Sequence, residues 1–241
     1  MIRLIFILIF LLFYFIFFLP VLLVQWLIRE KNPLRAAKLS KAVVGWGFRC
    51  IKCLAGVKLI VKGQENIPTD TSVLYVGNHR SYFDVVLTLS LFPNVTGYVA
   101  KKEIKKVPIL RRWMNAIHCI FLDRDNIKEG LKTILLGVEE LKNGYSLCIF
   151  PEGTRNKGED TLLPFHEGSF KLAEKSGVPI VPMTLVNSSA IFEDHFPLIK
   201  KTTVIIEFGD PIYVNQLDRE GKKNLSANVR EIIQATYVKN K

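Results

Sequence analysis

The side chains best suited to chemistry lie in a short polar stretch, Asn-His-Arg-Ser-Tyr-Phe-Asp at 78–84. It follows an apolar run at 73–76 that predicts a buried strand, and it precedes an apolar run that predicts a helix. His79 is a candidate general base, because a free imidazole titrates near neutral pH. Asp84 can hold that imidazole in one tautomer and stabilise its charged form, as the acid of a hydrolytic triad does. The stretch therefore predicts a catalytic pair between a strand and a helix.

The same residues also have the pattern of a helix start. In Ser81-x-x-Asp84 the serine is a favourable N-cap, and the aspartate lies in the first helical turn. The residues alone leave both interpretations open. The chain contains no Gly-x-Ser-x-Gly sequence, which disfavours covalent catalysis by a serine on a nucleophile elbow.

A second polar stretch, Phe-Pro-Glu-Gly-Thr-Arg at 150–155, directly follows the apolar run at 146–150. Proline and glycine favour a tight loop at the end of the strand. Thr154, Arg155 and the backbone N–H groups of such a loop can donate to a phosphate or a carboxylate, and a guanidinium can bind two oxygens at once. The alternative is a simple turn in which Glu152 and Arg155 pair with each other.

Three weaker features accompany these two stretches. Arg124 follows an apolar run at 119–122, but it is flanked by two aspartates and fits a surface ion pair equally well. The stretch at 101–112 is both basic and apolar. It fits a surface that contacts anionic lipid headgroups or an acidic carrier protein, and it also fits a solvated helix face. Val-Pro-Ile-Val-Pro at 178–182 predicts the start of a core strand.

From residue 57 onward, β-rich runs alternate with helical runs, which indicates an α/β fold. Several of the strand-like runs are apolar throughout, as expected for a sheet covered on both faces. We therefore predict a mostly parallel mixed sheet flanked by helices. Strands are expected at 57–61, 73–77, 96–100, 119–122, 146–150, 180–186 and 203–208. Helices are expected at 85–91, 109–116, 127–142, 168–175 and 226–238.

The N-terminal residues 4–28 are overwhelmingly apolar and long enough to cross a bilayer as a helix. Pro20 is expected to kink this helix or to split it into two segments that enter one leaflet. One arginine precedes the run and several cations follow it, so the positive-inside rule places the rest of the chain in the cytoplasm. Residues 34–54 predict an amphipathic helix that lies at the headgroups or packs on the folded domain.

Composition limits the class of partner. Lys and Arg outnumber Asp and Glu by 33 to 22, giving a net charge of +11, which suggests an acidic partner. A nucleic-acid binder would leave the apolar N-terminus unexplained, and we expect no nucleic-acid partner. The four cysteines do not form a disulfide framework: two lie in apolar runs, and the pair Cys50-x-x-Cys53 lacks the second pair that a zinc site needs.

Taken together, the motifs resemble the four ordered motifs of the glycerolipid acyltransferases, most closely the bacterial 1-acyl-sn-glycerol-3-phosphate acyltransferases. The motifs are Asn-His-x-x-x-x-Asp at 78–84, Phe-Leu-Asp-Arg at 121–124, Phe-Pro-Glu-Gly-Thr-Arg at 150–155 and Val-Pro-Ile-Val-Pro at 178–182. The match covers about residues 57–210. His-x-x-x-x-Asp alone is a weak signal, whereas four motifs in this order are specific.

The resemblance implies a reaction and residue roles. His79 would deprotonate the sn-2 hydroxyl of lysophosphatidic acid, which attacks an acyl thioester without a covalent intermediate, and Asp84 would orient His79. The implied glycerophosphate site consists of Lys101, Arg124, Glu152, Gly153, Thr154 and Arg155. The residues implied in binding the acyl donor or shaping its pocket are Val178, Pro179, Ile180 and Pro182.

The resemblance also implies acyl-CoA or acyl carrier protein as co-substrate, with no metal and no other cofactor. Residues 1–55 would anchor the chain to membrane lipid, and 56–241 would form the acyltransferase domain on the cytoplasmic side of the cell membrane. The alternatives are an acyltransferase for another lysolipid (a lyso-ornithine lipid or a lysophospholipid with a headgroup), a hydrolase, and a membrane-anchored lipid-binding protein without catalysis.

Overall fold

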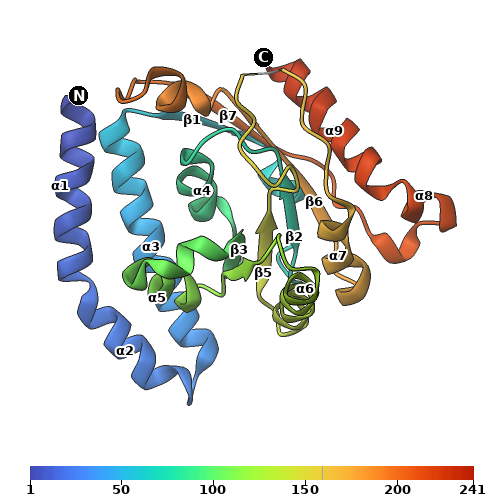
Figure 1. The fold of residues 1–241 in the computed structure, drawn as a ribbon, viewed down its shortest axis with the longest axis horizontal. Helices are drawn as coiled ribbons and strands as arrows, with labels where there is room; N and C mark the ends of the chain where they lie inside the picture. The colour runs from blue at the N-terminus through green and yellow to red at the C-terminus, as the bar shows by residue number, and fades with distance from the viewer. Residues whose placement is uncertain (159) are drawn as a thin grey trace.

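A seven-stranded mixed sheet forms the centre of the computed structural model, which describes residues 1–158 and 160–241 (Figure 1). The strands are β1 (Lys58–Lys62), β2 (Leu74–Gly77), β3 (Thr96–Lys101), β4 (Ile120–Leu122), β5 (Ser146–Ile149), β6 (Ile180–Val186) and β7 (Thr203–Phe208). Their order across the sheet is β1-β7-β6-β2-β5-β3-β4. Only the β6–β7 pair is antiparallel among these neighbours. All seven predicted strands and the mostly parallel mixed sheet are confirmed.

The helices are α1 (Ile2–Phe17), α2 (Leu19–Arg29), α3 (Pro33–Ala55), α4 (Phe83–Thr88), α5 (Pro108–Ala116), α6 (Ile127–Lys142), α7 (Lys171–Ser176), α8 (Arg219–Lys223) and α9 (Leu225–Asn240). The five helices predicted after residue 57 are confirmed, two of them in part as 3-10 turns at Leu89–Leu91 and Glu167–Phe170. The short α8 was not predicted.

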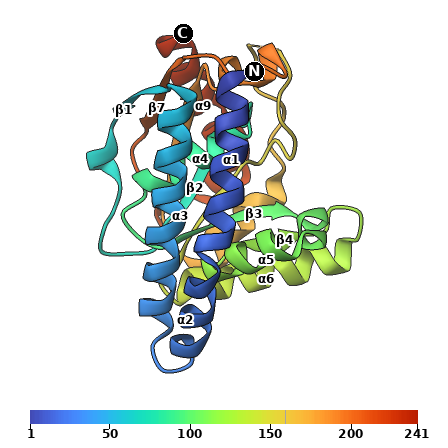
Figure 2. The same ribbon diagram turned by 90° about the vertical axis from the view of Figure 1, so that its left-hand side faces the viewer.

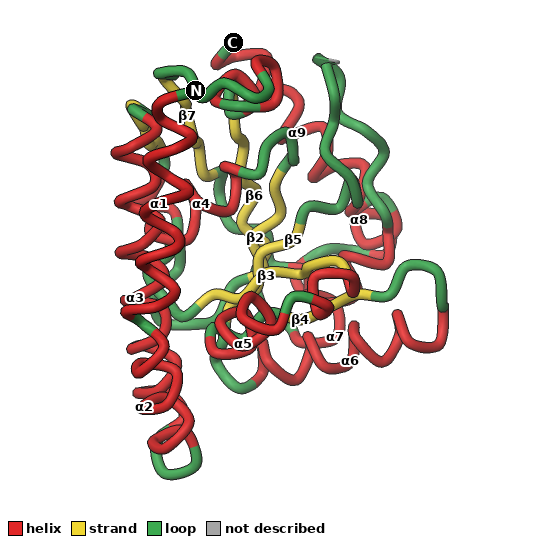
Figure 3. Tube along the Cα trace, turned by 60° about the vertical axis from the view of Figure 1, so that its left-hand side comes forward, coloured by secondary structure: helices red, strands yellow, loops and turns green. Residues whose placement is uncertain are grey.

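Two hydrophobic cores cover the two faces of the sheet. Helices α1, α3, α4 and α5 pack with Val73 and Tyr75 on one face, whereas α6, α7 and α9 pack with Leu74 and Val76 on the other (Figure 3). Because successive strand residues point to opposite faces, a strand covered on both sides must be apolar throughout. Every residue of β2 is buried.

The apolar N-terminal run is split into two helices, as one of the alternatives predicted. α1 ends at Phe17, and α2 follows at an angle of 43° with Pro20 in its first turn. Proline is tolerated there because the first N–H groups of a helix have no intrahelical partner. In the described residues no single helix is long and apolar enough to cross a membrane, while the bent pair α1–α2 has a sufficient length and composition.

Residues 34–54 form most of α3, which lies beside α1 and packs on the folded domain (Figure 2). Trp46 of α3 joins an aromatic cluster with Phe10 and Tyr14 of α1, at ring-centroid distances of 5.9 and 6.2 Å. Of the two alternatives for this helix, the structure shows the packed one. Its buried Ile51 belongs to the same core as Tyr75 of the sheet, so one core connects the N-terminal helices with the strands.

Gly97 of β3 stands where no side chain fits. A Cβ at this position would lie 2.0 Å from the carbonyl oxygen of His118 and 2.8 Å from the backbone nitrogen of Cys119. The backbone of His118 has little freedom to move, because its N–H donates to Asn115 and its ring stacks on Tyr145 at 3.6 Å.

We therefore expect Gly97→Ala to lower the free energy of unfolding by at least about 2 kcal/mol, measured by urea denaturation in detergent. Gly168→Ala is the matched control, since a Cβ there meets nothing within 4 Å. Its effect should stay below about 0.5 kcal/mol. Equal stability of the two variants would contradict the close approach of Gly97 to the backbone of His118.

Candidate active site

The strand order brings the predicted motifs to one edge of the sheet. Strands β6, β2, β5, β3 and β4 are parallel neighbours, so their carboxyl ends face the same way. The histidine motif follows β2, the loop at 150–155 follows β5, Lys101 ends β3, and Arg124 follows β4. Ligands of α/β proteins bind at this kind of edge. Four segments far apart in the sequence therefore meet in one place.

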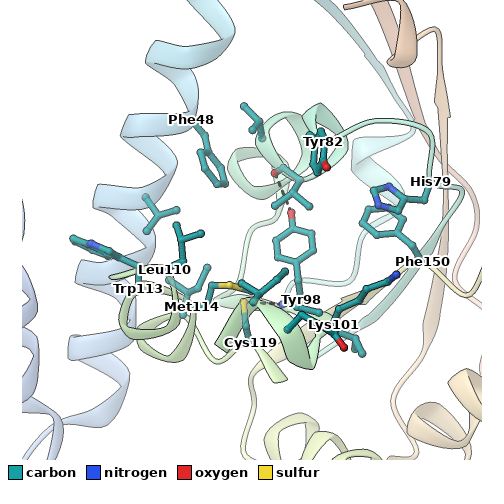
Figure 4. A pocket seen from close by; sticks show the side chains of 18 of the residues that line it. Phe48, His79, Tyr82, Tyr98, Lys101, Leu110, Trp113, Met114, Cys119 and Phe150 are labelled. Atoms are coloured by element: carbon teal, nitrogen blue, oxygen red, sulfur yellow. Dashed lines mark hydrogen bonds between the residues drawn. The ribbon is translucent and has the colours of Figure 1, made fainter. Parts of the chain in front are cut away.

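His79 and Asp84 form a direct pair. Nδ1 of His79 lies 2.7 Å from Oδ2 of Asp84, whose side chain is fully buried. The same Oδ2 accepts hydrogen bonds from the backbone N–H groups of Arg80 and Ser81, both at 2.8 Å. The imidazole also stacks on Phe150, with ring centroids 4.4 Å apart (Figure 4). With Nδ1 engaged, Nε2 is the atom that remains to exchange a proton.

The helix start and the histidine–aspartate pair turn out to be one structure. Ser81 Oγ accepts a hydrogen bond from the backbone N–H of Phe83, the first residue of α4, at 3.0 Å. The Asp84 carboxylate accepts in return from the N–H of Ser81. These two bonds fix the carboxylate at the start of α4, although the N-cap residue of this helix is Tyr82 rather than Ser81. The helix start and the His79–Asp84 contact therefore coexist, and the catalytic role of the pair stays a prediction.

Glu152 holds the backbone of the histidine. Its Oε1 accepts from the N–H of His79 at 2.8 Å, and its Oε2 accepts from the N–H of Leu163 at 3.0 Å. Burial raises the pKa of Glu152, and these two N–H donors oppose the rise. Because both oxygens are occupied and the residue does not line the cavity, the predicted contact of Glu152 with substrate does not match its position. The alternative pairing with Arg155 is also wrong.

Arg155 has other partners. Its Nη1 lies 3.2 Å from Oε1 of Glu193, and its guanidinium carbon lies 3.7 Å above the ring of Tyr82. Gly153 adopts a φ of +69°, and a Cβ there would approach Nε2 of His166 at 3.0 Å, so the loop requires glycine at this position. Gly153, Thr154 and Arg155 all line the cavity described below.

The acids beside Arg124 neutralise a different cation. Lys102 Nζ lies 2.7 Å from Asp123 and 3.0 Å from Asp125, and these contacts raise the pKa of Lys102. The guanidinium of Arg124 instead donates to the carbonyl oxygen of Gly153, and burial lowers its pKa. The surface ion-pair alternative for Arg124 is therefore wrong. Arg124 and Lys101 both line the cavity.

The fourth motif lies away from the cavity. Val178, Pro179, Ile180 and Pro182 are buried, and β6 begins at Ile180 in the middle of the sheet. None of the four lines the cavity. Their implied role in binding the acyl donor or in shaping its pocket stays a prediction, and the structure shows the four residues buried away from the cavity lining. The interpretation of 178–182 as the start of a core strand is confirmed.

A cavity of about 740 Å³ extends from the histidine to the N-terminal helices. Figure 4 shows His79 and Lys101 at one side and Trp113 and Met114 of α5 at the other. The walls between them are mostly apolar side chains. From α1 and α3 they include Phe10, Leu11, Tyr14, Phe15, Val44, Phe48 and Ile51. One end can hold polar groups, and the rest can hold a hydrocarbon chain.

Sequence reasoning missed several contributors to this site. Tyr82, Phe150 and Glu193 were not singled out, nor was the part that α1 and α3 take in the cavity wall. Phe150 and Tyr82 lie inside recognised motifs, so their positions offered a signal. Glu193 offered none, because it belongs to no motif and meets Arg155 across 38 residues.

Comparison with known proteins identifies the family. A family model described as Acyltransferase matches residues 58–186. The 1-acyl-sn-glycerol-3-phosphate acyltransferase of Borreliella burgdorferi is 34% identical over 187 residues, 76% of this chain and 74% of that protein. The probable 1-acyl-sn-glycerol-3-phosphate acyltransferase of Mycoplasma genitalium is 30% identical over 224 residues, 86% of this chain and 79% of that protein.

A solved structure shows the same fold. The crystal structure of the 1-acyl-sn-glycerophosphate (LPA) acyltransferase PlsC from Thermotoga maritima superposes with a TM-score of 0.77 at 24% identity, covering 98% of this chain and 97% of that chain. The matched family model spans more than half of the chain and includes all four motifs in full. This chain is therefore a member of the acyltransferase family.

Proposed function

We propose that the protein transfers a fatty acyl group from an acyl thioester to the sn-2 hydroxyl of lysophosphatidic acid, giving phosphatidic acid. The observation that carries the proposal is the His79–Asp84 pair at the polar end of an otherwise apolar cavity. Lys101, Arg124 and Arg155 line the same cavity. The names of the relatives, which are 1-acyl-sn-glycerol-3-phosphate acyltransferases, support the choice of acceptor.

The proposed chemistry needs one base and no covalent intermediate. Nε2 of His79 takes the proton of the acceptor hydroxyl as its oxygen attacks the thioester carbonyl. Asp84 stabilises the imidazolium that forms, since it already holds Nδ1. When the tetrahedral intermediate collapses, the C–S bond breaks and the thiolate leaves with the proton from His79. No step in this scheme requires a metal or another cofactor.

Binding fixes the acceptor from its two ends. The phosphate would bind Arg155 and Thr154, with Lys101 and Arg124 adding positive charge. The acyl chain would lie along the apolar wall. Holding the hydroxyl beside Nε2 in this way converts a collision between two substrates into a local reaction. Glu152 and Gly153 contribute by shaping the loop rather than by touching the phosphate.

Two other lysolipid classes remain as alternative acceptors: a lyso-ornithine lipid, which has no phosphate, and a lysophospholipid with a headgroup on its phosphate. The donor is acyl-CoA or acyl carrier protein. Both are acidic, and the basic stretch at 101–112 suits either one. Purified protein assayed with each donor against each acceptor separates these possibilities.

The N-terminal helices are proposed to hold the protein in the cytoplasmic leaflet of the cell membrane. Large apolar side chains of α1 and α2 are exposed, among them Phe13, Phe17 and Trp26 at 52, 72 and 54%. Lysines and arginines follow the two helices in sequence. An apolar helix surface followed by positive charges favours the boundary between the acyl chains and the headgroups of a bilayer. Since α1 also lines the cavity, a lipid substrate can enter from that leaflet.

His79→Ala should reduce formation of phosphatidic acid by at least about 100-fold, because general-base catalysis typically contributes 10²–10⁴. The assay uses lysophosphatidic acid and labelled acyl thioester, with unchanged thermal stability as evidence of folding. His195→Ala is the control, as His195 does not line the cavity. Retained activity would refute the base assignment. In the wild type, release of free fatty acid without formation of phosphatidic acid would indicate a hydrolase. Absence of both free fatty acid and phosphatidic acid would favour a lipid-binding protein.

Arg155→Lys should raise the KM for lysophosphatidic acid, or lower kcat, by at least about tenfold, since an ammonium cannot bind two phosphate oxygens in a fixed plane. Initial rates at varied acceptor and fixed donor measure this change. Arg230→Lys, which alters an arginine that donates to the backbone of Leu162 and Leu163, is the control and should keep the wild-type KM. An unchanged KM and kcat in Arg155→Lys would show that the loop is structural.

Membrane attachment is tested by placing charges on the exposed face of α1. The double variant Phe13→Glu and Phe17→Glu should weaken co-sedimentation with vesicles of mixed anionic and zwitterionic phospholipids by at least about tenfold, because two aromatic side chains leave the apolar boundary. Val238→Glu on α9 is the control, as Val238 is 64% exposed on the other side of the sheet. Equal binding of both variants would contradict this attachment.

A further inference from the structure

Glu193 connects two loops of the site that leave different strands. It lies in η6 (Glu193–His195), beyond the carboxyl end of β6, and its side chain is 20% exposed. Oε2 accepts a hydrogen bond from Ser81 Oγ at 2.6 Å. Oε1 accepts from the backbone N–H of Tyr82 at 2.7 Å and lies 3.2 Å from Nη1 of Arg155. One carboxylate therefore ties the loop after β2 to the loop after β5.

These contacts control both surfaces that orient the guanidinium of Arg155. Nη1 of the guanidinium donates to Oε1 of Glu193, and one face of the guanidinium stacks on the ring of Tyr82 at 3.7 Å. The backbone of Tyr82 is itself held by Glu193. A charge-assisted hydrogen bond and a cation–π contact together define the plane of the group. Loss of Glu193 would remove the hydrogen bond to Nη1 of Arg155 directly. It would also free the backbone of Tyr82, and with it the ring on which Arg155 stacks.

We propose that Glu193 is a positioning residue for the acceptor: it holds Arg155 in the plane that a phosphomonoester requires. A guanidinium has five N–H donors in a rigid fork, and the hydrogen bond to Glu193 uses one of them, on Nη1. The remaining donors are available to the phosphate in the cavity that Arg155 lines. An arginine ordered in advance loses less conformational freedom on binding. This inference rests on the proposed function, because it assumes that the acceptor's phosphate binds Arg155.

A purely structural role of Glu193 predicts different kinetic effects. If Glu193 only joined two loops, its removal would lower thermal stability and change the KM for donor and acceptor together, or change neither. A positioning role acts on the phosphate alone. The discriminating quantities are therefore the KM for the acceptor compared with the KM for the donor, and the preference for a phosphorylated acceptor.

The first experiment measures both quantities in Glu193→Ala. The KM for lysophosphatidic acid should rise at least about tenfold while the KM for the acyl thioester stays within about twofold. The ratio of kcat/KM for lysophosphatidic acid to that for monoacylglycerol, its dephosphorylated analogue, should fall by a similar factor. Asp194→Ala is the matched control, since the neighbouring carboxylate bonds only Ser189 Oγ, at 3.0 Å, among the described side chains. It should leave all three values unchanged.

A double-mutant cycle tests whether the effect passes through Arg155. In an Arg155→Ala background, Glu193→Ala should change kcat/KM for lysophosphatidic acid by less than about twofold, because the group it positions is gone. If the two substitutions instead lowered kcat/KM by independent factors that multiply in the double variant, the inference would be wrong. An unchanged KM for the acceptor in the single variant Glu193→Ala would also overturn it.

Glu193→Gln keeps the test decisive if the alanine variant does not fold. The amide keeps the shape but removes the charge, so the acceptor KM should rise about threefold to fivefold. An unchanged KM would again overturn the inference. Phosphatidic acid formation by the wild type is measured first. Its absence would refute the proposed function, whereas an active wild type with unaffected Glu193 variants would refute only the role of Glu193.

Discussion

The buried carboxylate of Asp84 is the constraint around which the site is built. A charge without access to water is costly unless donors surround it. Here two backbone N–H groups and the imidazole of His79 converge on Oδ2, while Oδ1 has no hydrogen-bond partner in the described residues. Among the described residues, His79 is the one side chain that this carboxylate contacts by hydrogen bond. In the proposed reaction, this anion 2.7 Å from Nδ1 would stabilise the imidazolium that forms when His79 takes a proton.

The central strands determine how the rest of the site assembles. Because β2 lies between β6 and β5, the loops that follow these three strands are adjacent at one edge. Glu152 and Glu193 use that adjacency in opposite ways. Glu152 is turned inward and fixes the backbone of His79, whereas Glu193 contacts Arg155, which lines the cavity. Two carboxylates thus connect the loop that carries His79 with the loop that carries Arg155.

Sequence patterns predicted the features that depend on residues close together in the chain. They missed the features that depend on contacts between residues far apart in the chain. Continuous apolar runs indicated several strands, among them the fully buried β2, since coverage of both sheet faces demands them. The pair of His79 and Asp84 was recognisable because five residues separate its members. Glu152 was assigned to the substrate site by the family resemblance, yet only the structure shows that its two oxygens accept from the N–H groups of His79 and Leu163. The cavity wall depends on α1, whose contact with residues beyond 110 no local pattern encodes.

The apolar character of the N-terminal helices has two physical reasons rather than one. A helix that served only as an anchor would need one apolar face, toward the lipid. α1 is apolar on both sides: Phe13 and Phe17 are exposed, while Phe10 and Tyr14 line the cavity. Its buried Ile7 belongs to the main core. The hydropathy that resembles a membrane span therefore also reflects a wall shared with the active site. A mutation that disturbs this wall should affect the handling of the acyl chain even where the proposed attachment to the membrane is intact, because α1 would then lie between the bilayer and the cavity.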